Sequence, residues 1–254
     1  MTDRLNDSLR VIPWLLVLWV TSLSGCHTSR EPYLDSRSPS QTLLDRSIQF
    51  HDPDQAWGRE SIAIHWMGTK PDGSVSFAVD MEFDPDGAFS MRGERKGHTI
   101  DYWVSDGVVE ARVDGELEVS DELRAEMVLD RDDGLFWRDY LGFLAALPMG
   151  LRDPDVHLAP NVDDAELEDR DVLSIRASFA PEVGTDTWTF YLDPSTAELV
   201  GCRFDKADPA RDGETIIFDG LSSVAGIQLP RTRSWYMNKD RRFLGTDQVT
   251  ASGE

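Results

Sequence analysis

Large apolar residues alternate with polar ones over much of the chain, which is the pattern of β-strands with one buried face. In segment 75–83 every second residue is large and apolar: Val75, Phe77, Val79, Met81 and Phe83. Rougher alternation predicts further strands at 62–66, 89–92, 100–104 and 109–113. Four Asp-Gly pairs punctuate these runs and predict tight hairpin turns, in which both central residues need positive φ. The first half of the chain therefore predicts an antiparallel meander with one solvated face.

A different spacing, typical of helices, precedes this meander. Ser38, Pro39 and Gln41 form the pattern of a capping box with proline at the first helical position. Apolar residues then recur at intervals of three and four, and Pro53 disfavours helical backbone at the residue before it. We predict an amphipathic helix from Pro39 to about His51.

A second helical block, 121–147, is split near Gly134 and is stopped by Pro148. Its second part is apolar over most of the circumference, with one stripe that contains Phe136, Tyr140, Phe143, Leu144 and Leu147. An acid-rich loop is expected over 152–171. Strands then resume at 173–179, 187–192, 199–204, 215–218, 227–237 and 243–250.

Two sets of hairpins with apolar helices between them predict an α+β fold. We expect a single curved antiparallel sheet or an incomplete β-barrel, with helices covering the concave face, because the apolar face of such a sheet must be covered. A closed barrel of eight to ten strands with its helices outside is the alternative that the expected strands also permit.

The N-terminus has the organisation of a bacterial lipoprotein signal. Arg4 and Arg10 lie in a polar head, an apolar stretch follows, and Leu23-Ser24-Gly25-Cys26 is similar to a lipobox. The apolar stretch would form about 20 Å of helix, whereas a bilayer core is about 30 Å thick. We therefore predict a signal peptide over 1–25, lipidation of Cys26, a lipidated tether over 26–37 and one domain over 38–254.

Composition narrows the possible partners. The chain has 47 Asp plus Glu against 25 Lys plus Arg, a formal charge of −22. A nucleic-acid partner is not expected, because phosphate binding needs clustered cations. The chain has two cysteines; with Cys26 lipidated, Cys202 has no intramolecular partner and is predicted to be a buried thiol. The predicted partner is the membrane, through the lipid anchor, and any protein partner is unspecified.

Because the sequence lacks the common catalytic, metal-binding and phosphate-binding motifs, we predict no catalytic residues, no metal site and no cofactor. A Gly-x-Ser-x-Gly elbow, a His-Glu-x-x-His pair and a glycine-rich phosphate loop are missing from the sequence. The segment from Asp130 to Gly134 fails as a calcium loop, because its glycine stands at position five and Leu141 occupies the place of the bidentate glutamate. Basic residues concentrate at Arg231, Arg233 and the turn 238–242, where they either balance nearby charge or meet an acidic partner or lipid phosphate.

The number of large apolar residues suggests a ligand. A half-barrel under movable helices encloses space that an acyl chain can occupy, although the same residues can also fill the core completely. The candidate ligand-binding residues are Phe77, Val79, Met81, Tyr140, Phe143, Leu144, Leu147, Trp188 and Phe190.

Several motifs, in consistent order over about 43–250, resemble an uncharacterised family of bacterial envelope lipoproteins of the Bacteroidetes type. They are His51-Asp52-Pro53 with Trp57, Leu147-Pro148-Met149 to Asp153-Pro154, Gly184 to Tyr191 with Asp193-Pro194, Gly226 to Pro230 with Trp235-Tyr236 to Asp240, and Leu244 to Asp247. More distantly, the layout is similar to that of the lipoprotein carriers LolA and LolB. That resemblance implies a half-barrel that holds acyl chains.

These observations favour a lipid-anchored envelope protein that binds a lipid or an acyl chain without catalysis. An acidic structural or interaction module with a filled core is the alternative, and an unrecognised hydrolase is a third hypothesis. His27 follows Cys26 in place of the aspartate that resembles an inner-membrane retention signal, so we expect the outer membrane, with the domain facing the periplasm.

Overall fold

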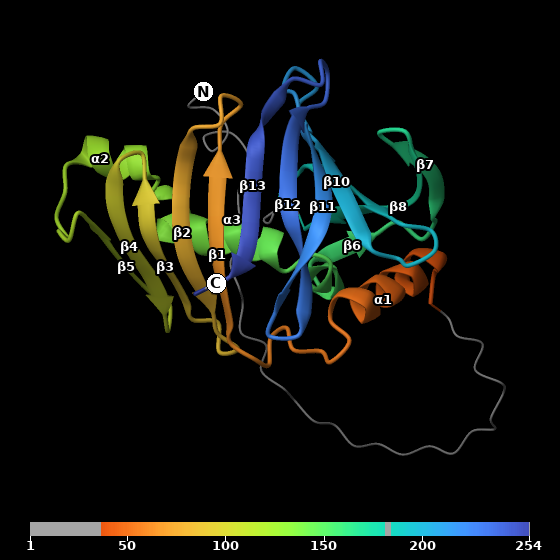
Figure 1. The fold of residues 1–254 in the computed structure, drawn as a ribbon, viewed down its shortest axis with the longest axis horizontal. Helices are drawn as coiled ribbons and strands as arrows, with labels where there is room; N and C mark the ends of the chain where they lie inside the picture. The colour runs from red at the N-terminus through yellow and green to blue at the C-terminus, as the bar shows by residue number, and fades with distance from the viewer. Residues whose placement is uncertain (1–36, 181–183, 254) are drawn as a thin grey trace.

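The computed structural model describes residues 37–180 and 184–253, which form one antiparallel sheet with helices on one face (Figure 1). The strands are β1 (Ile62–Thr69), β2 (Val75–Phe83), β3 (Phe89–Arg95), β4 (His98–Ser105), β5 (Val108–Val113), β6 (Val156–Leu158), β7 (Asp163–Leu167), β8 (Arg170–Phe179), β9 (Thr187–Leu192), β10 (Leu199–Asp205), β11 (Glu214–Val224), β12 (Ile227–Met237) and β13 (Phe243–Ala251). The helices are α1 (Pro39–His51), α2 (Asp121–Met127) and α3 (Phe136–Ala145), with 3-10 turns η1 (Arg131–Gly134) and η2 (Met149–Arg152).

The strand order is β5-β4-β3-β2-β1-β13-β12-β11-β10-β9-β8-β6, and β7 also pairs with β8. β13 lies between β1 and β12, so the last strand of the chain joins the two sets of hairpins. Within the described residues the edge strands β5 and β6 do not pair with each other. The prediction of a single antiparallel sheet with helices is therefore confirmed, and the closed-barrel alternative is wrong.

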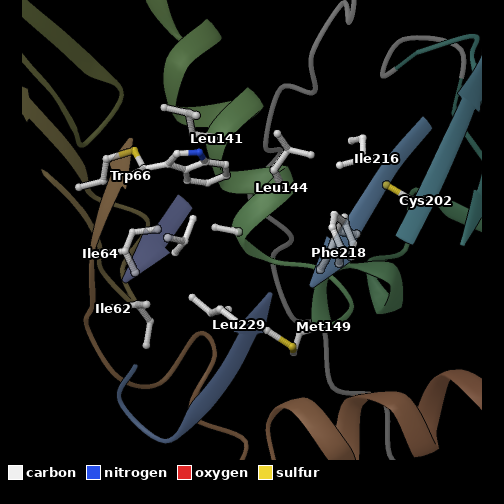
Figure 2. Close-up of a cluster of buried hydrophobic side chains, with 14 of the residues drawn as sticks. Ile62, Ile64, Trp66, Leu141, Leu144, Met149, Cys202, Ile216, Phe218 and Leu229 are labelled. Atoms are coloured by element: carbon white, nitrogen blue, oxygen red, sulfur yellow. The ribbon is translucent and has the colours of Figure 1, made fainter. Parts of the chain in front are cut away.

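The inner face of the sheet, which we define as the face that α3 crosses, carries the core. In Figure 1 α3 runs behind β2, β1, β13 and β12, while α1 lies beside the second half of the sheet. Figure 2 shows side chains of β1, α3 and β10 to β12 converging in this layer. One continuous cluster of buried apolar residues extends over both halves of the sheet, and a smaller cluster of Leu167, Val172 and Val200 is separate from it.

Local signals placed most elements where the sequence predicted them. In α1, Ser38 Oγ accepts from the backbone N–H of Gln41 at 3.2 Å, and Gln41 Oε1 accepts from the N–H of Ser38 at 2.9 Å, which completes the capping box. The strands β2, β9 and β12 have the predicted bounds. The helical block is split as expected. α2 ends at Met127, its C-cap Val128 has a φ of 60°, and η1 precedes α3.

The acid-rich segment predicted as a loop over 152–171 is the main error in the element prediction. It contains β6 and β7, and β8 begins at Arg170. Most side chains of β7 are exposed, so acidic residues stand on both faces of the strand and no alternation is visible. The strand exists because its backbone pairs with β8 at the edge of the sheet, where charged side chains remain in water.

The Asp-Gly turns are only partly as predicted. Both central residues have positive φ at Asp106-Gly107, which joins β4 to β5, and at Asp114-Gly115. At the two earlier pairs only Gly73 and Gly87 have positive φ. There the aspartate carboxylates instead accept from backbone N–H groups two residues on, which is the Asx-turn arrangement.

The end of α1 is fixed to the sheet by a buried histidine. His51 Nδ1 lies 2.5 Å from the carbonyl oxygen of Gln228, and Nε2 accepts from the N–H of Leu199 at 2.9 Å. The imidazole is therefore neutral, with its proton on Nδ1. The next residue, Asp52, accepts from the N–H groups of Ala56 and Trp57 and shapes the loop that leads into β1.

The buried His51 predicts a specific loss of stability in acid. Burial lowers the pKa of His51 from its usual value of 6.5, against a smaller raising effect of the Gln228 carbonyl. Its contribution to stability is therefore present above pH 6.5 and is lost as the pH falls towards the folded-state pKa. We expect the free energy of unfolding to fall there by up to about 1.4 kcal/mol per pH unit more than in His51→Gln.

The measurement is urea unfolding of both proteins at pH values between 5 and 8. His65→Gln makes the same substitution at a partly exposed position and is the matched control. Equal slopes for the wild type and His51→Gln would contradict the prediction.

Candidate functional site

α3 is held across the inner face by contacts at its start and along its length. Tyr102 of β4 donates to the carbonyl of Gly134, just before the helix, and Trp137 Nε1 donates to the carbonyl of Met127 at 3.0 Å. Phe143, near the end of the helix, packs edge-on against Trp188 with ring centroids 4.9 Å apart. The helix therefore connects the two halves of the sheet across its inner face.

All nine candidate ligand-binding residues belong to the core cluster. Val79, Met81, Leu144, Leu147, Trp188 and Phe190 are buried, and Phe77, Tyr140 and Phe143 are partly exposed. Direct ring contacts join Phe143, Trp188 and Phe190. Val79 and Met81 lie on β2, on the other side of the junction formed by β1 and β13. The structure thus places the candidates in one layer, as two groups bridged by α3.

The most unusual member of this layer is Arg233. In the sequence it belongs to the same basic concentration as Arg231 and the turn 238–242. Arg231 is exposed, whereas Arg233 is only 1% exposed. Arg233 Cζ lies 4.5 Å from the ring centroid of Trp66 and 5.8 Å from that of Phe218. None of its three side-chain nitrogens has a hydrogen-bond partner among the described residues. The structure therefore separates the two arginines of the basic concentration, because Arg231 lies on the surface and Arg233 in the core.

The position of Arg233 follows from strand register. Phe218 on β11, Arg233 on β12, Asp247 on β13 and Gly68 on β1 are consecutive cross-strand partners. Beyond Gly68 the same row reaches Phe77 on β2, and a Cβ at Gly68 would lie 2.2 Å from the Phe77 ring. We call these five residues the guanidinium row. It crosses the centre of the sheet.

Burial dominates the electrostatics of Arg233. It lowers the pKa of Arg233 to about 10, although Asp247, Cys202 and Tyr140 act in the opposite direction. The Asp247 carboxylate accepts from Trp235 Nε1 at 2.8 Å. Holding a charged group away from water without hydrogen bonds costs several kcal/mol, and cation–π contacts return only about 1–2 kcal/mol each. The inner face therefore keeps a polar group that its own packing does not stabilise fully.

A second buried arginine lies nearer the start of α3. Arg95 of β3 is 6% exposed, its Cζ is 4.5 Å from the Trp137 ring centroid, and its Nε has no hydrogen-bond partner among the described residues. Burial lowers the pKa of Arg95 to about 10, and Tyr140 and Glu126 oppose that shift. Tyr140 of α3 thus raises the pKa of both buried arginines.

The histidines do not form a nucleophile–base pair in the described structure. His51 is used by two backbone groups. His65 Nδ1 is 3.1 Å from Asp80, and Ser252 Oγ donates to the same carboxylate at 3.0 Å, so the acid stands between histidine and serine. In a catalytic triad the histidine occupies the middle place. This cluster consequently lacks the geometry that activates a serine.

The opposite face carries a polar hollow of about 380 Å³ over β7 to β10. Its lining includes Asp163, Asp164, Tyr191, Arg203 and Asp205. Arg203 donates to Asp205 at 2.6 Å, so part of its charge is already balanced. The hollow is mixed in charge and belongs to the solvated side of the sheet.

Within 37–180 and 184–253, no three or more His, Cys, Asp or Glu side chains gather closely enough to hold an ion. Nor does any helix of that part of the chain combine the length and hydropathy needed to cross a bilayer. Cys26, the signal peptide over 1–25 and nearly all of the tether over 26–37 lie outside the described residues.

The chain belongs to a family of unknown function, DUF6503, whose model matches residues 34–251. This agrees with the resemblance to an uncharacterised family. No curated protein matches the sequence significantly.

Solved structures with a similar arrangement share little sequence with the chain. A LolA superfamily protein from Nitrosomonas europaea is 10% identical, with a TM-score of 0.46 over 82% of this chain and 90% of that one. A DUF1329 family protein from Desulfovibrio piger is 8% identical, with a TM-score of 0.47 over 85% and 94%. For a putative outer membrane lipoprotein-sorting protein domain from Vibrio parahaemolyticus the values are 9%, 0.36, 82% and 91%.

The buried thiol of Cys202 provides a test of how tightly the inner layer is packed. Its side chain is fully buried, as predicted, and burial raises its pKa well above the usual range. In Cys26→Ser protein, Cys202 is the sole cysteine, so Ellman's reagent should react at least about a hundredfold more slowly than after guanidinium denaturation. Comparable rates in the two states would show that the inner layer is open to solvent.

Proposed function

We propose that the protein is a lipid-anchored component of the bacterial envelope whose domain binds a lipid or acyl chain between the sheet and α3, without catalysis. The observation that supports this most strongly is that a single short helix, α3, spans the inner face of the sheet. One helix of ten residues bridges the two halves of the sheet, and its aromatic residues Tyr140 and Phe143 stay partly exposed. A cover attached through side chains can move away from the sheet without breaking strand pairing.

The energy needed for such a movement is within reach of an acyl chain. Burying each methylene contributes about 0.8 kcal/mol, so a chain of about twelve carbons supplies on the order of 9 kcal/mol before entropy losses. The ligand would replace contacts that α3 now makes, such as those of Phe143 with Trp188. Binding then amounts to an exchange of one apolar cover for another.

The alternative function is an acidic interaction module with a permanently filled core. It is favoured by the continuity of the core cluster and by the polar hollow on the opposite face, where Asp163, Asp164 and Asp205 lie beside Arg176 and Arg203. This alternative predicts that apolar ligands do not reach the inner face.

Membrane attachment is the second part of the proposal. It depends on Cys26 and on the signal-like segment that precedes it. We place the domain in the periplasm, at the outer membrane, because His27 rather than aspartate follows Cys26.

Tryptophan fluorescence tests the ligand site directly. Trp66 and Trp188 are buried on the inner face, so a neutral brominated fatty alcohol that enters this layer should quench their emission on contact. Phe143→Ala should strengthen binding about tenfold, because it removes an α3 ring that the ligand has to displace from Trp188. Phe243→Ala deletes the same group from a position on β13 that is 36% exposed, and should leave the affinity unchanged. If saturating alcohol caused no quenching, the filled-core alternative would be correct.

The anchor is tested by labelling growing cells with a radioactive fatty acid. The wild-type protein should carry label and sediment with membranes, whereas Cys26→Ser should lose the label, because its side chain cannot form the thioether to the diacylglycerol. Cys202→Ser is the control and should label normally, since Cys202 is buried within the domain. Equal labelling of wild type and Cys26→Ser would overturn lipidation at this residue.

A further inference from the structure

We propose that Arg233 is the binding site for an oxyanion, a carboxylate or phosphate, and that the ligand of the inner face is therefore an anionic amphiphile. This inference rests on the proposed function, because it uses the same layer between the sheet and α3. It adds the chemical class of the head group and the residue that binds it.

The first argument is the unsatisfied hydrogen-bonding capacity of Arg233. The side chain is buried, and Nε and both terminal nitrogens lack hydrogen-bond partners among the described residues. Unlike a lysine ammonium, a guanidinium presents its donors as a planar fork that fits two oxygens of one carboxylate or phosphate. Buried groups of this kind are normally paired, because leaving them unpaired is costly.

The second argument is the surroundings of the guanidinium. Trp66 and Phe218 pack against it and keep it in place. Asp247 of β13, Cys202 of β10 and Tyr140 of α3 raise its pKa and so favour its charged form. Asp247 is already an acceptor for Trp235. Trp66 and Phe218 are aromatic, which suits the chain of an amphiphile, and neither ring supplies an oxygen acceptor for the fork.

The third argument is the route by which Arg233 becomes accessible. Its row lies at the centre of the sheet, on the strands that α3 crosses in Figure 1. Tyr140 belongs to α3 and acts on both Arg233 and Arg95. Displacement of α3 by an acyl chain would therefore uncover the guanidinium at the same time. One movement would provide both the apolar contacts and the anion contact.

The test compares two amphiphiles of equal chain length, dodecanoate and dodecanol, on protein freed of copurified lipid. Binding is measured at pH 8, where the acid is ionised, and below the micelle concentration. The wild-type protein should bind dodecanoate at least tenfold more tightly than dodecanol. In Arg233→Met this ratio should fall to about one, and in Arg233→Lys it should be intermediate. Arg231→Met, on the same strand but exposed, should keep the wild-type ratio.

Unfolding of the ligand-free variants separates recognition from a structural role. Arg233→Met also removes the charge opposite Asp247, its cross-strand neighbour, so a lower urea midpoint by itself does not contradict the inference. A lower midpoint together with an unchanged dodecanoate-to-dodecanol ratio would overturn the inference and assign Arg233 to the stability of the fold.

The remaining outcomes separate this inference from the proposed function. If the wild type binds dodecanol but does not prefer dodecanoate, the anion site is wrong and the apolar-ligand proposal stands. If neither amphiphile binds, but phosphate or acetate raises the unfolding midpoint of the wild type and not of Arg233→Met, the anion site stands and the apolar ligand is excluded. Failure of all four probes to bind the wild type would overturn both proposals.

Discussion

The inner face of the open sheet must be covered, and the rest of the structure depends on this constraint. The core cluster draws on strands from β1 to β13, but a sheet whose edges stay apart cannot bury that surface by closing on itself. Side chains from the helices have to do so. The pairing of β13 with both β1 and β12 makes the demand larger, because it merges two hairpin sets into one continuous surface. α3 meets this demand by crossing the junction.

Much of this architecture was predictable because the apolar face imposes a period of two on the strands. β2, β9 and β12 were found with correct bounds because one of their faces is buried and the other is solvated. The same reasoning missed β6, which has only three residues, and β7, whose acidic side chains are mostly exposed at the edge of the sheet. Both strands are defined by backbone pairing with β8, and such pairing leaves no periodic signal in so short or so polar a segment.

The central arginine was missed for a different reason. Arg233 is in phase with Ile227, Leu229 and Trp235, which occupy the buried positions of β12. Arg231 has the same phase but is exposed, beside Gly220, where the pairing of β11 with β12 skips a residue pair. Alternation alone therefore does not separate the two arginines, and charge alone groups both with the exposed turn that follows. Residue type normally decides burial for arginine, so the burial of Arg233 is visible only in the structure.

A filled core and a ligand site are two states of the same layer, and Arg233 links them energetically. With α3 in place, the guanidinium is buried without hydrogen-bond partners in the described structure. The free-energy cost of burying it therefore raises the free energy of the ligand-free state. An anion that pairs with it removes that cost only in the bound state. Such a difference between states is what allows a ligand to shift a conformational equilibrium, whereas affinity common to both states shifts nothing. A neutral chain must displace α3 by burial alone, while an anionic amphiphile gains a contact that the helix does not make. The same buried charge that weakens the closed form would thus favour ligands with an acidic head group, within a protein whose acidic surface repels free anions.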